Sequence, residues 1–514
     1  MDDFEGTGVF WLADNPETQV AGTIRFSAET GATIDLIGAF GQIETFAEED
    51  EGDVRILGVA GRKLLTLSHC LRTNRTIEMP GIPRETWNAG LVLAGAQWGP
   101  SEEFEFDRLT VEFDQLPNWV SRSGVEIEME ERQEPNKITR LSATLRPLDK
   151  ETVPIDEVRQ LSLNYTWALG GDHITDTRIG QSHALQVSYA TPQPLELLLA
   201  DLRSLQDLVT LGADAPASPT AISVSHPDIK REPHERLPEE QQRLPIHLFL
   251  RTGRTPAEEP QNRHKLLLGF DAVGGLATAA SWLKVADRYR SALGSLFSIR
   301  YSDRMYIENR FLNVVTAAET FHRIGFSNEI LPADQYKTRR RSIIRAVPKE
   351  HRDWLGSRLQ FANEPRLSDR LRDLVGLAGD GFQWLVPDQA QFVDVVVHVR
   401  NRLTHYDEDA DRVTESEPLW LYIEALYVLV VQAALRTANV AEDALLPLRE
   451  NQRLLWLRRQ LGDALPQSSH ERRLFDGAMM RPRMRPRPPM TAPRSFGSQR
   501  PGTTLRCDIL SDII

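Results

Sequence analysis

The spacing of hydrophobic residues along the chain changes once, near residue 270. Before that point hydrophobic and polar residues alternate over short runs, as in residues 23–26, 65–71 and 109–113, which is typical of strands with one buried face. Beyond it hydrophobic residues recur every three or four positions, which is typical of amphipathic helices. The pattern predicts an α+β protein. A β-rich, sandwich- or barrel-like region over residues 1–270 is followed by an all-helical bundle over residues 271–465.

Two features interrupt the predicted strands. A break near residues 117–124 would divide the β-rich region into two lobes, because Pro and Asn interrupt strands. Leucines repeat at helical spacing between Pro194 and Gly212, which predicts a helix that starts after the proline and closes at the glycine. The Pro- and Glu-rich stretch beyond it predicts a strand over residues 220–224 and a mobile loop around residues 230–242.

The helical half predicts a bundle of helices joined by short links. The expected helices span residues 275–299, 305–324, 337–346, 349–361, 368–377, 388–404, 418–439 and 445–462. The composition changes again at the end of the chain. Residues 466–514 include the run Arg-Pro-Arg-Met-Arg-Pro-Arg-Pro-Pro, which can form neither a helix nor a central strand. We expect this basic tail to be disordered.

One stretch of the bundle carries candidate chemistry. Arg400 is followed directly by Asn401, and His405 lies five residues beyond the arginine. An arginine binds a phosphate through its planar fork, and a histidine moves a proton near neutral pH. RNA supplies its own nucleophile, the 2′-hydroxyl, so these two groups provide most of what strand cleavage requires.

The helical context distinguishes this motif from a chance match. A stripe of hydrophobic residues marks the buried face of the predicted helix: Phe392, Val395, Val396, Val399 and Leu403. At 100° per residue, Asp394, His398, Asn401 and His405 fall on the opposite face, with Arg400 on its flank. The alternative is a solvated face ending in a histidine that the helix macrodipole favours.

Arg178 and His183 repeat the same Arg-x4-His spacing. They lie in a segment that predicts strand and turn, with Gly180 between them, and we interpret this match as chance. Glu308 and Glu319, three helical turns apart on one face of an earlier helix, could each support Arg400 or His405. The alternative is that both carboxylates face solvent.

The net charge of −13 argues against a protein that coats nucleic acid over its whole surface, so RNA contact would be local. A basic cluster in the helical half offers such a patch: Lys337, Arg339, Arg340, Arg341 and Arg345. Within it Arg339, Arg340 and Arg341 are the candidate RNA-binding residues. The alternative is a solvated helix face.

The composition argues against several other classes of protein. With only Cys70 and Cys507 the chain has neither a disulfide framework nor a four-cysteine zinc site. It has no phosphate-binding loop and no histidine pair at metal-ligand spacing, so we expect no cofactor and no metal. The N-terminus has no signal-peptide pattern and no apolar run is long enough to span a membrane, so we expect a cytoplasmic protein.

Two regions resemble one known family. Residues 304–461 resemble a HEPN domain, a helical bundle with an Arg-x4-6-His signature on a late helix, and Asn401 matches the polar residue that usually follows that arginine. Residues 306–322 are similar to the first HEPN helix of ApeA-like proteins. The Gly-Val-Phe-Trp-Leu-Ala-Asp-Asn-Pro opening of residues 8–16 resembles that of the ApeA N-terminal domain.

The resemblance implies a bacterial anti-phage protein of the abortive-infection type, whose HEPN part is a metal-independent endoribonuclease with Arg400, Asn401 and His405 as catalytic residues. It further implies a homodimer or larger even oligomer, with RNA as substrate, tRNA as one candidate, and a phage-encoded trigger as a further partner. The β-rich half would either sense the infection or restrain the nuclease. One alternative is a non-catalytic HEPN module that binds RNA or a protein. Another is a β-sandwich ligand-binding protein with a helical oligomerisation domain.

Overall fold

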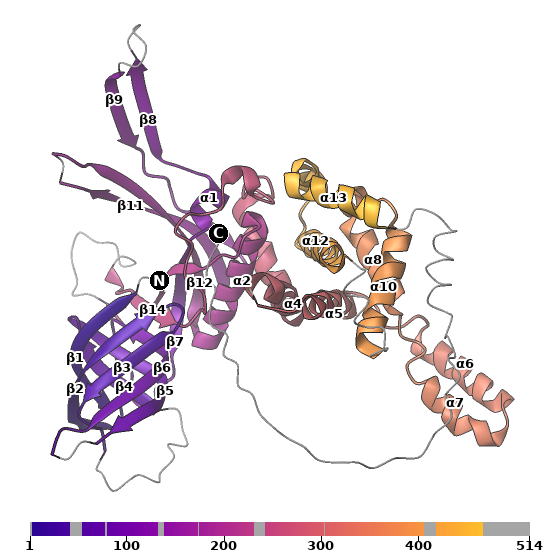
Figure 1. The fold of residues 1–514 in the computed structure, drawn as a ribbon, viewed down its shortest axis with the longest axis horizontal. Coiled ribbons are helices and arrows are strands. Elements are labelled where there is room, and N and C mark those ends of the chain that lie inside the picture. Colours follow the sequence, from indigo (N-terminus) through magenta and orange to yellow (C-terminus); the bar gives the residue numbers. More distant parts are fainter. Residues whose placement is uncertain are drawn as a thin grey trace, which may run out of the picture. The chain divides into compact units, whose positions relative to one another are not determined.

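The computed structural model describes most of the chain. The described residues are 3–41, 54–77, 80–131, 138–172, 174–230, 242–302, 304–405 and 418–465. The N-terminal half is built from strands (Figure 1). The first seven are β1 Phe4–Leu12, β2 Asn15–Ser27, β3 Gly31–Ile37, β4 Val54–Ala60, β5 Lys63–Thr76, β6 Arg84–Ala94 and β7 Glu105–Phe113. The others are β8 Val125–Glu131, β9 Ile138–Leu145, β10 Glu151–Pro154, β11 Arg159–Gly170, β12 Arg178–Pro194, β13 Pro219–Ser225 and β14 Ile246–Leu250.

Strands β1 to β6 close into an antiparallel barrel. Neighbours pair in the order β1–β2–β3–β6–β5–β4, and β4 pairs back with β1. Alternate side chains fill its interior, among them Phe10, Ile24 and Ile34, each with no exposed surface. The barrel-like prediction is therefore confirmed for this part of the chain.

Strand β6 carries the sheet out of the barrel. Its first half pairs with β3 and its second half, Leu91 to Ala94, pairs with β14. The sheet continues from β14 through β13, β7, β12 and β11 to β10, while β8 and β9 form a separate two-stranded ribbon. Helix α1, Leu116–Val120, lies at the predicted break. Because β7 pairs with both β12 and β13, one sheet contains strands from both sides of that break.

The predicted leucine-rich helix is α2, Leu195–Ala213, but Gly212 does not close it. The helix ends instead at Ala213 and is capped by Asp214, whose φ of 55° is left-handed. A Cβ at Gly212 would lie 2.0 Å from the indole Nε1 of Trp119, so glycine is required there by packing. Strand β13 confirms the strand predicted next, and the expected loop falls largely on residues 231–241, which lie outside the described residues.

The C-terminal half is helical, as predicted. Its α-helices are α4 Gly275–Tyr301, α5 Ile307–Gly325, α6 Ala333–Ala346, α7 Arg352–Arg358, α8 Leu367–Ala378, α9 Asp380–Leu385, α10 Gln389–His405, α12 Leu419–Thr437 and α13 Gln452–Ala464. Short 3-10 turns are η1 Arg263–Lys265, η2 Lys349–His351 and η3 Asp443–Glu450. The single helix predicted over residues 445–462 is wrong. Pro447 lies in η3 and lacks the N–H that an α-helix needs, while the Asn451 side chain caps a new helix, α13.

Helix α12 corrects another expectation, that no apolar run is long enough to span a membrane. Among the described residues it is the helix long and apolar enough to cross a membrane, whereas the sequence had indicated no such run. Of its most apolar window, 83% is buried inside the protein, as expected of the central helix of a bundle.

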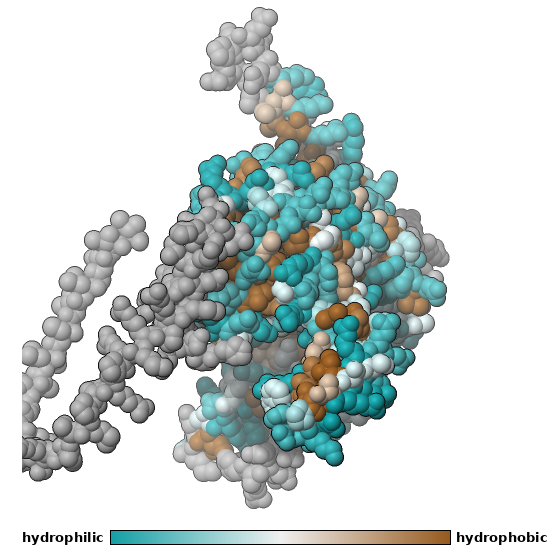
Figure 2. All heavy atoms as spheres, turned by 90° about the vertical axis from the view of Figure 1, so that its right-hand side faces the viewer, coloured by the Kyte–Doolittle hydropathy of each residue, from teal (hydrophilic) through white to brown (hydrophobic). Residues whose placement is uncertain are grey.

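Ion pairs connect the two halves. Helix α4 packs against α2, α5 and α12. At their meeting point Glu424 of α12 accepts hydrogen bonds from Arg300 of α4 and from Arg453 of α13, and Arg453 also binds Asp214 at the end of α2. Figure 2 shows one face of the molecule, on which hydrophilic residues predominate and hydrophobic residues form small separate areas. The domain boundary at residue 270 stays a prediction, and residues 466–514 lie outside the described residues.

Candidate active site

Helix α10 carries the predicted motif. Its predicted hydrophobic stripe is confirmed as the packed face, since Phe392, Val396 and Val399 have no exposed surface. Asp394 and Asn401 on the opposite face are exposed. The helix runs to His405, so the motif occupies its last turns. The side chain of His405 lies outside the described part of the structure.

The guanidinium of Arg400 is held between two oxygen acceptors. Its Nη2 lies 3.7 Å from Oε2 of Glu319 on α5, and its Nη1 donates to Oδ1 of Asn401 at 3.2 Å. The Arg400 side chain keeps a third of its surface exposed. An arginine has five N–H donors in a planar fork, so the exposed part of the guanidinium keeps donors for a ligand.

Of the two glutamates that could have supported the motif, the structure selects Glu319. Glu308 forms no ion pair among the described residues. Glu319 also acts electrostatically on Arg370 of α8, so one carboxylate faces cations on both neighbouring helices. Helix α10 also approaches α8 directly, because Oδ1 of Asp394 lies 3.9 Å from Nη2 of Arg372.

A buried polar cluster lies beside this pair, and the sequence analysis missed it. Nη1 of Arg370 donates to Nδ1 of His322 at 3.1 Å and to Oδ1 of Asn328 at 2.7 Å. Because a guanidinium only donates, Nδ1 is the acceptor, so the His322 proton sits on Nε2 and is donated to Asp373 at 2.9 Å. Burial lowers the pKa of His322, against the raising effect of Asp373. The imidazole is therefore neutral near pH 7.

This cluster is an Arg–His contact in space, yet it is a poor candidate for cleavage. His322 has no exposed surface and Arg370 is 1% exposed, so a phosphate cannot reach either side chain. The sequence signal that could have found it is weak. His322 continues the buried stripe of α5, four residues after Ala318, where an apolar residue is expected.

The second Arg-x4-His match is not a site. Arg178 and His183 lie on strand β12, and residues an odd number apart point to opposite faces of a strand. Arg178 is largely exposed and pairs with Asp176. The His183 ring is buried and hydrogen-bonds to the carbonyl oxygen of Arg122 at 2.9 Å.

The candidate RNA-binding arginines do not share a face, because they are consecutive residues of helix α6. Arg339 and Arg341 are exposed. Arg340 turns inward and donates to the carbonyl oxygen of Gly356 at 2.7 Å, so it holds α6 to the segment of α7. Their role in RNA binding stays a prediction.

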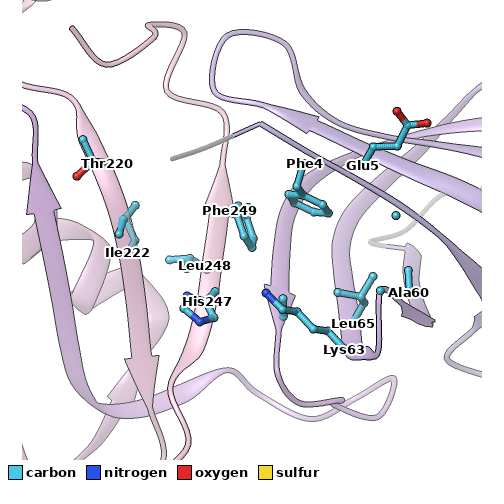
Figure 3. A pocket seen from close by; sticks show the side chains of 14 residues that line it. Phe4, Glu5, Ala60, Lys63, Leu65, Thr220, Ile222, His247, Leu248 and Phe249 are labelled. Atoms are coloured by element: carbon cyan, nitrogen blue, oxygen red, sulfur yellow. The ribbon is translucent and has the colours of Figure 1, made fainter. Parts of the chain in front are cut away.

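The β-rich half contains a cavity of about 460 Å³ that no sequence signal indicated. It lies where strands β13 and β14, which pair at Ser223 and Val224, diverge. Figure 3 shows Phe4 and Phe249 on one side of it, and Lys63 extending toward His247. Burial lowers the pKa of His247, and the charge of Lys63 lowers it further. The cavity thus offers mostly apolar walls with one cationic side chain, Lys63, and one carboxylate, Glu5.

Comparison with known families matches both halves. A family model described as ApeA N-terminal domain 1 matches residues 5–281, more than half of the chain, and one described as Apea-like HEPN matches residues 312–444. The chain belongs to the ApeA-like family. A search of curated proteins and a search of solved structures each gave no match to it.

The two matched ranges contain almost all of the residues described above. Glu319, the buried His322–Arg370 pair and Arg400 all lie inside the HEPN match, and the residues that line the cavity of the β-rich half, apart from Phe4, lie inside the N-terminal match. The family indicates nuclease-type anti-phage defence, and HEPN domains are commonly nucleases. Among the residues that the structure describes, no three His, Cys, Asp or Glu side chains gather as a metal site would require, and the metal independence of the reaction stays a prediction.

Proposed function

We propose that this ApeA-like protein is a cytoplasmic, metal-independent endoribonuclease of anti-phage defence, and that Arg400, Asn401 and His405 cleave the RNA. The observation that carries this proposal is the placement of Arg400. Glu319 and Asn401 fix its guanidinium at the last turns of α10, yet the side chain is exposed enough to meet a phosphate. A fixed arginine stabilises charge that develops on a phosphate without having to reorganise first.

The reaction requires a base and an acid. The 2′-oxygen attacks the neighbouring phosphorus while its proton passes to one His405, and the bond from phosphorus to the 5′-oxygen breaks as a second His405 gives that oxygen a proton. The products are a 2′,3′-cyclic phosphate and a 5′-hydroxyl. Arg400 binds the non-bridging oxygens, and Asn401 orients the guanidinium through its Oδ1.

One histidine cannot serve as acid and base in the same step, so we propose a homodimer or larger even oligomer in which two α10 helices meet. The exposed, polar side chains of Asp394 and Asn401 on α10 support this arrangement, since the bundle itself leaves that face uncovered. A two-fold axis would bring two copies of the motif together.

Cleavage is tested with purified protein and total bacterial RNA, tRNA included, in the presence of EDTA. We expect fragments with 2′,3′-cyclic phosphate and 5′-hydroxyl ends. A loss of cleavage on chelation that Mg²⁺ or Mn²⁺ restores would rule out the mechanism. RNA retention without fragments would instead support the non-catalytic HEPN alternative.

The cavity of the β-rich half favours a second role, ligand recognition, through which a phage-encoded trigger would act. Lys63 lies at the cavity and carries its fixed positive charge. Replacing Lys63 with Glu should therefore abolish protection of cells against phage while leaving cleavage by the purified protein unchanged. Unaltered protection would show that the cavity does not take part in sensing the phage.

A further inference from the structure

The arm formed by residues 330–363 is the segment between α5 and α8 that contains α6, η2 and α7. Asn363 closes its base, donating to the carbonyl oxygen of Leu331 at 2.8 Å and accepting from the N–H of Leu331 at 2.9 Å. No residue of α6, η2 or α7 is buried. The arm is therefore held by its own hydrogen bonds rather than by a hydrophobic core.

The charge of the arm is opposite to that of the chain. It contains eight Lys or Arg residues and three Asp or Glu residues, a net charge of +5 in a protein of net charge −13. Three of the cations follow one another at four-residue intervals on α6: Lys337, Arg341 and Arg345. This basic stripe spans about 80° of the helix and about 12 Å of its length.

The basic stripe does not stabilise the fold through any ion pair among the described residues. Its three side chains are exposed, and none of them forms an ion pair within the described chain. Like charges four residues apart destabilise a helix, although Arg345, in the last turn of α6, is favoured there by the helix macrodipole. Arg340, by contrast, is engaged with Gly356, and Arg339 lies about 160° from Lys337 around the helix.

The arm is joined to the proposed active site through its base. Glu364, next to Asn363, pairs with Arg323 of α5 at 3.4 Å and with Arg370 of α8 at 3.7 Å. Arg370 lies in the field of Glu319, the partner of Arg400. A ligand on the arm would thus be held on the two helices that also position the catalytic arginine.

The arm also exposes two large aromatic side chains, Trp354 at 63% and Phe361 at 66%. Other aromatic side chains, such as Tyr306 and Trp167, are also exposed in this protein, but those of the arm lie in the same short segment as the basic stripe. Cations that follow a backbone, together with exposed aromatic rings, are the features by which proteins bind single-stranded nucleic acid, because unpaired bases stack on the rings. A duplex offers phosphates but no free base faces.

We infer that the arm binds single-stranded RNA, with the basic stripe on the phosphates and Trp354 or Phe361 under the bases, and so delivers unpaired RNA to Arg400. This inference rests on the proposed ribonuclease function and names the class of substrate. It keeps Arg341 of the predicted trio and assigns Lys337 and Arg345 in place of Arg339 and Arg340.

The test measures binding in the full chain with His405→Ala, so that RNA stays intact. A fluorescein-labelled 12-nucleotide RNA is titrated at several salt concentrations, and the triple variant Lys337→Ala, Arg341→Ala, Arg345→Ala is compared with its parent. Each phosphate contact to a single strand contributes about 0.7 to the salt slope. We expect the slope to fall by about 2 and the affinity at about 0.15 M salt to fall roughly 10- to 50-fold.

Three controls sharpen the result. Neutralising three exposed cations outside the arm, Arg84, Lys150 and Lys265, should leave the slope unchanged. Exchanging Lys and Arg within the stripe should preserve binding, because charge is kept. Trp354→Ala should weaken binding of the single strand but not binding of a duplex of the same sequence. Equal losses from the two triple variants, or an equal effect of Trp354→Ala on duplex and single strand, would overturn the inference.

Cleavage assays separate this inference from the proposed function. In an otherwise wild-type chain, the triple stripe variant should raise KM with kcat unchanged at saturating RNA. If RNA is cleaved but KM and the salt slope are unaltered, the arm is not an RNA-binding element while the nuclease stands. If RNA binds the arm but is never cleaved, the nuclease fails while the arm stands. Binding of the stripe to phosphatidylserine vesicles, with none to RNA, would identify a membrane surface as the partner and reject RNA.

Discussion

The chain contains the spacing Arg-x4-His twice, once on strand β12 and once on helix α10, and the two copies differ in almost every physical respect. On β12, Arg178 and His183 point to opposite faces about 16 Å apart along the strand. On α10, Arg400 and His405 are about 7.5 Å apart along the axis. A spacing in sequence therefore describes a site only after the secondary structure is known.

The surroundings of the two copies differ as well. His183 is buried against Tyr165, with ring centroids 5.3 Å apart, and its hydrogen bond ends on a backbone carbonyl. Arg400 faces Glu319 of another helix and remains partly exposed. The first arrangement stabilises a sheet, whereas the second leaves donors for a ligand. The following predictions test that contrast.

The largest effect should come from the helical copy. Replacing His405 with Ala should lower the cleavage rate about 10²–10⁴-fold, because a proton-transfer group is lost, and Arg400→Ala should be nearly as severe. His183→Ala and Arg178→Ala should leave the rate per folded molecule unchanged. The measurement is the initial rate on total RNA, with the folded fraction determined by circular dichroism. A change below about threefold for His405→Ala would show that the wrong copy was chosen.

A smaller loss is expected from Glu319, which positions Arg400. Glu319→Gln keeps an acceptor but removes the charge, so kcat should fall roughly tenfold as the guanidinium loses its fixed place. Glu308→Gln, on the same helix and without an ion pair in the described structure, is the matched control. If Glu319 were only structural, Glu319→Gln would lower the melting temperature and leave kcat as it was.

Mixing experiments test the shared site. Wild-type chains are co-refolded with His405→Ala chains in known ratios. If two histidines act together, activity should follow the square of the wild-type fraction, so an equal mixture retains about a quarter of the activity. Activity proportional to the wild-type fraction, from a protein of monomeric mass, would mean that each chain acts alone.

The copy on strand β12 should instead affect how the free energy of unfolding depends on pH. Burial lowers the pKa of His183, so the folded state binds its proton less readily than the unfolded state. The free energy of unfolding should then decrease as the pH falls below about 6.5, by less than about 1.4 kcal/mol per pH unit from this residue. His183→Gln should lose less stability than wild type between pH 7.5 and 5, as measured by urea midpoints. Equal losses would show that His183 does not contribute.

Much of the fold followed from local pattern. Alternation predicted the strands, and the three-to-four-residue period predicted the helices, including the buried stripe of α10. Both signals report which side of an element is hydrophobic, and that depends only on residues close together in the sequence. The errors arose where local signals mislead. Gly212 resembled a helix end but accommodates Trp119, and Pro447 divides a stretch whose hydrophobic period continues across it.

The sequence by itself determined the type of each element, the hydrophobic face of α10 and the candidate motif at its end. Only the tertiary structure decided that β4 pairs back with β1 to close a barrel, that Glu319 rather than Glu308 meets Arg400, and that His322 contacts Arg370. It also separated Arg340 from the exposed stripe on α6. The physical reason is that periodicity is a short-range property of the backbone. Contacts between distant residues depend on which faces of folded elements come together, and many packings satisfy the same period.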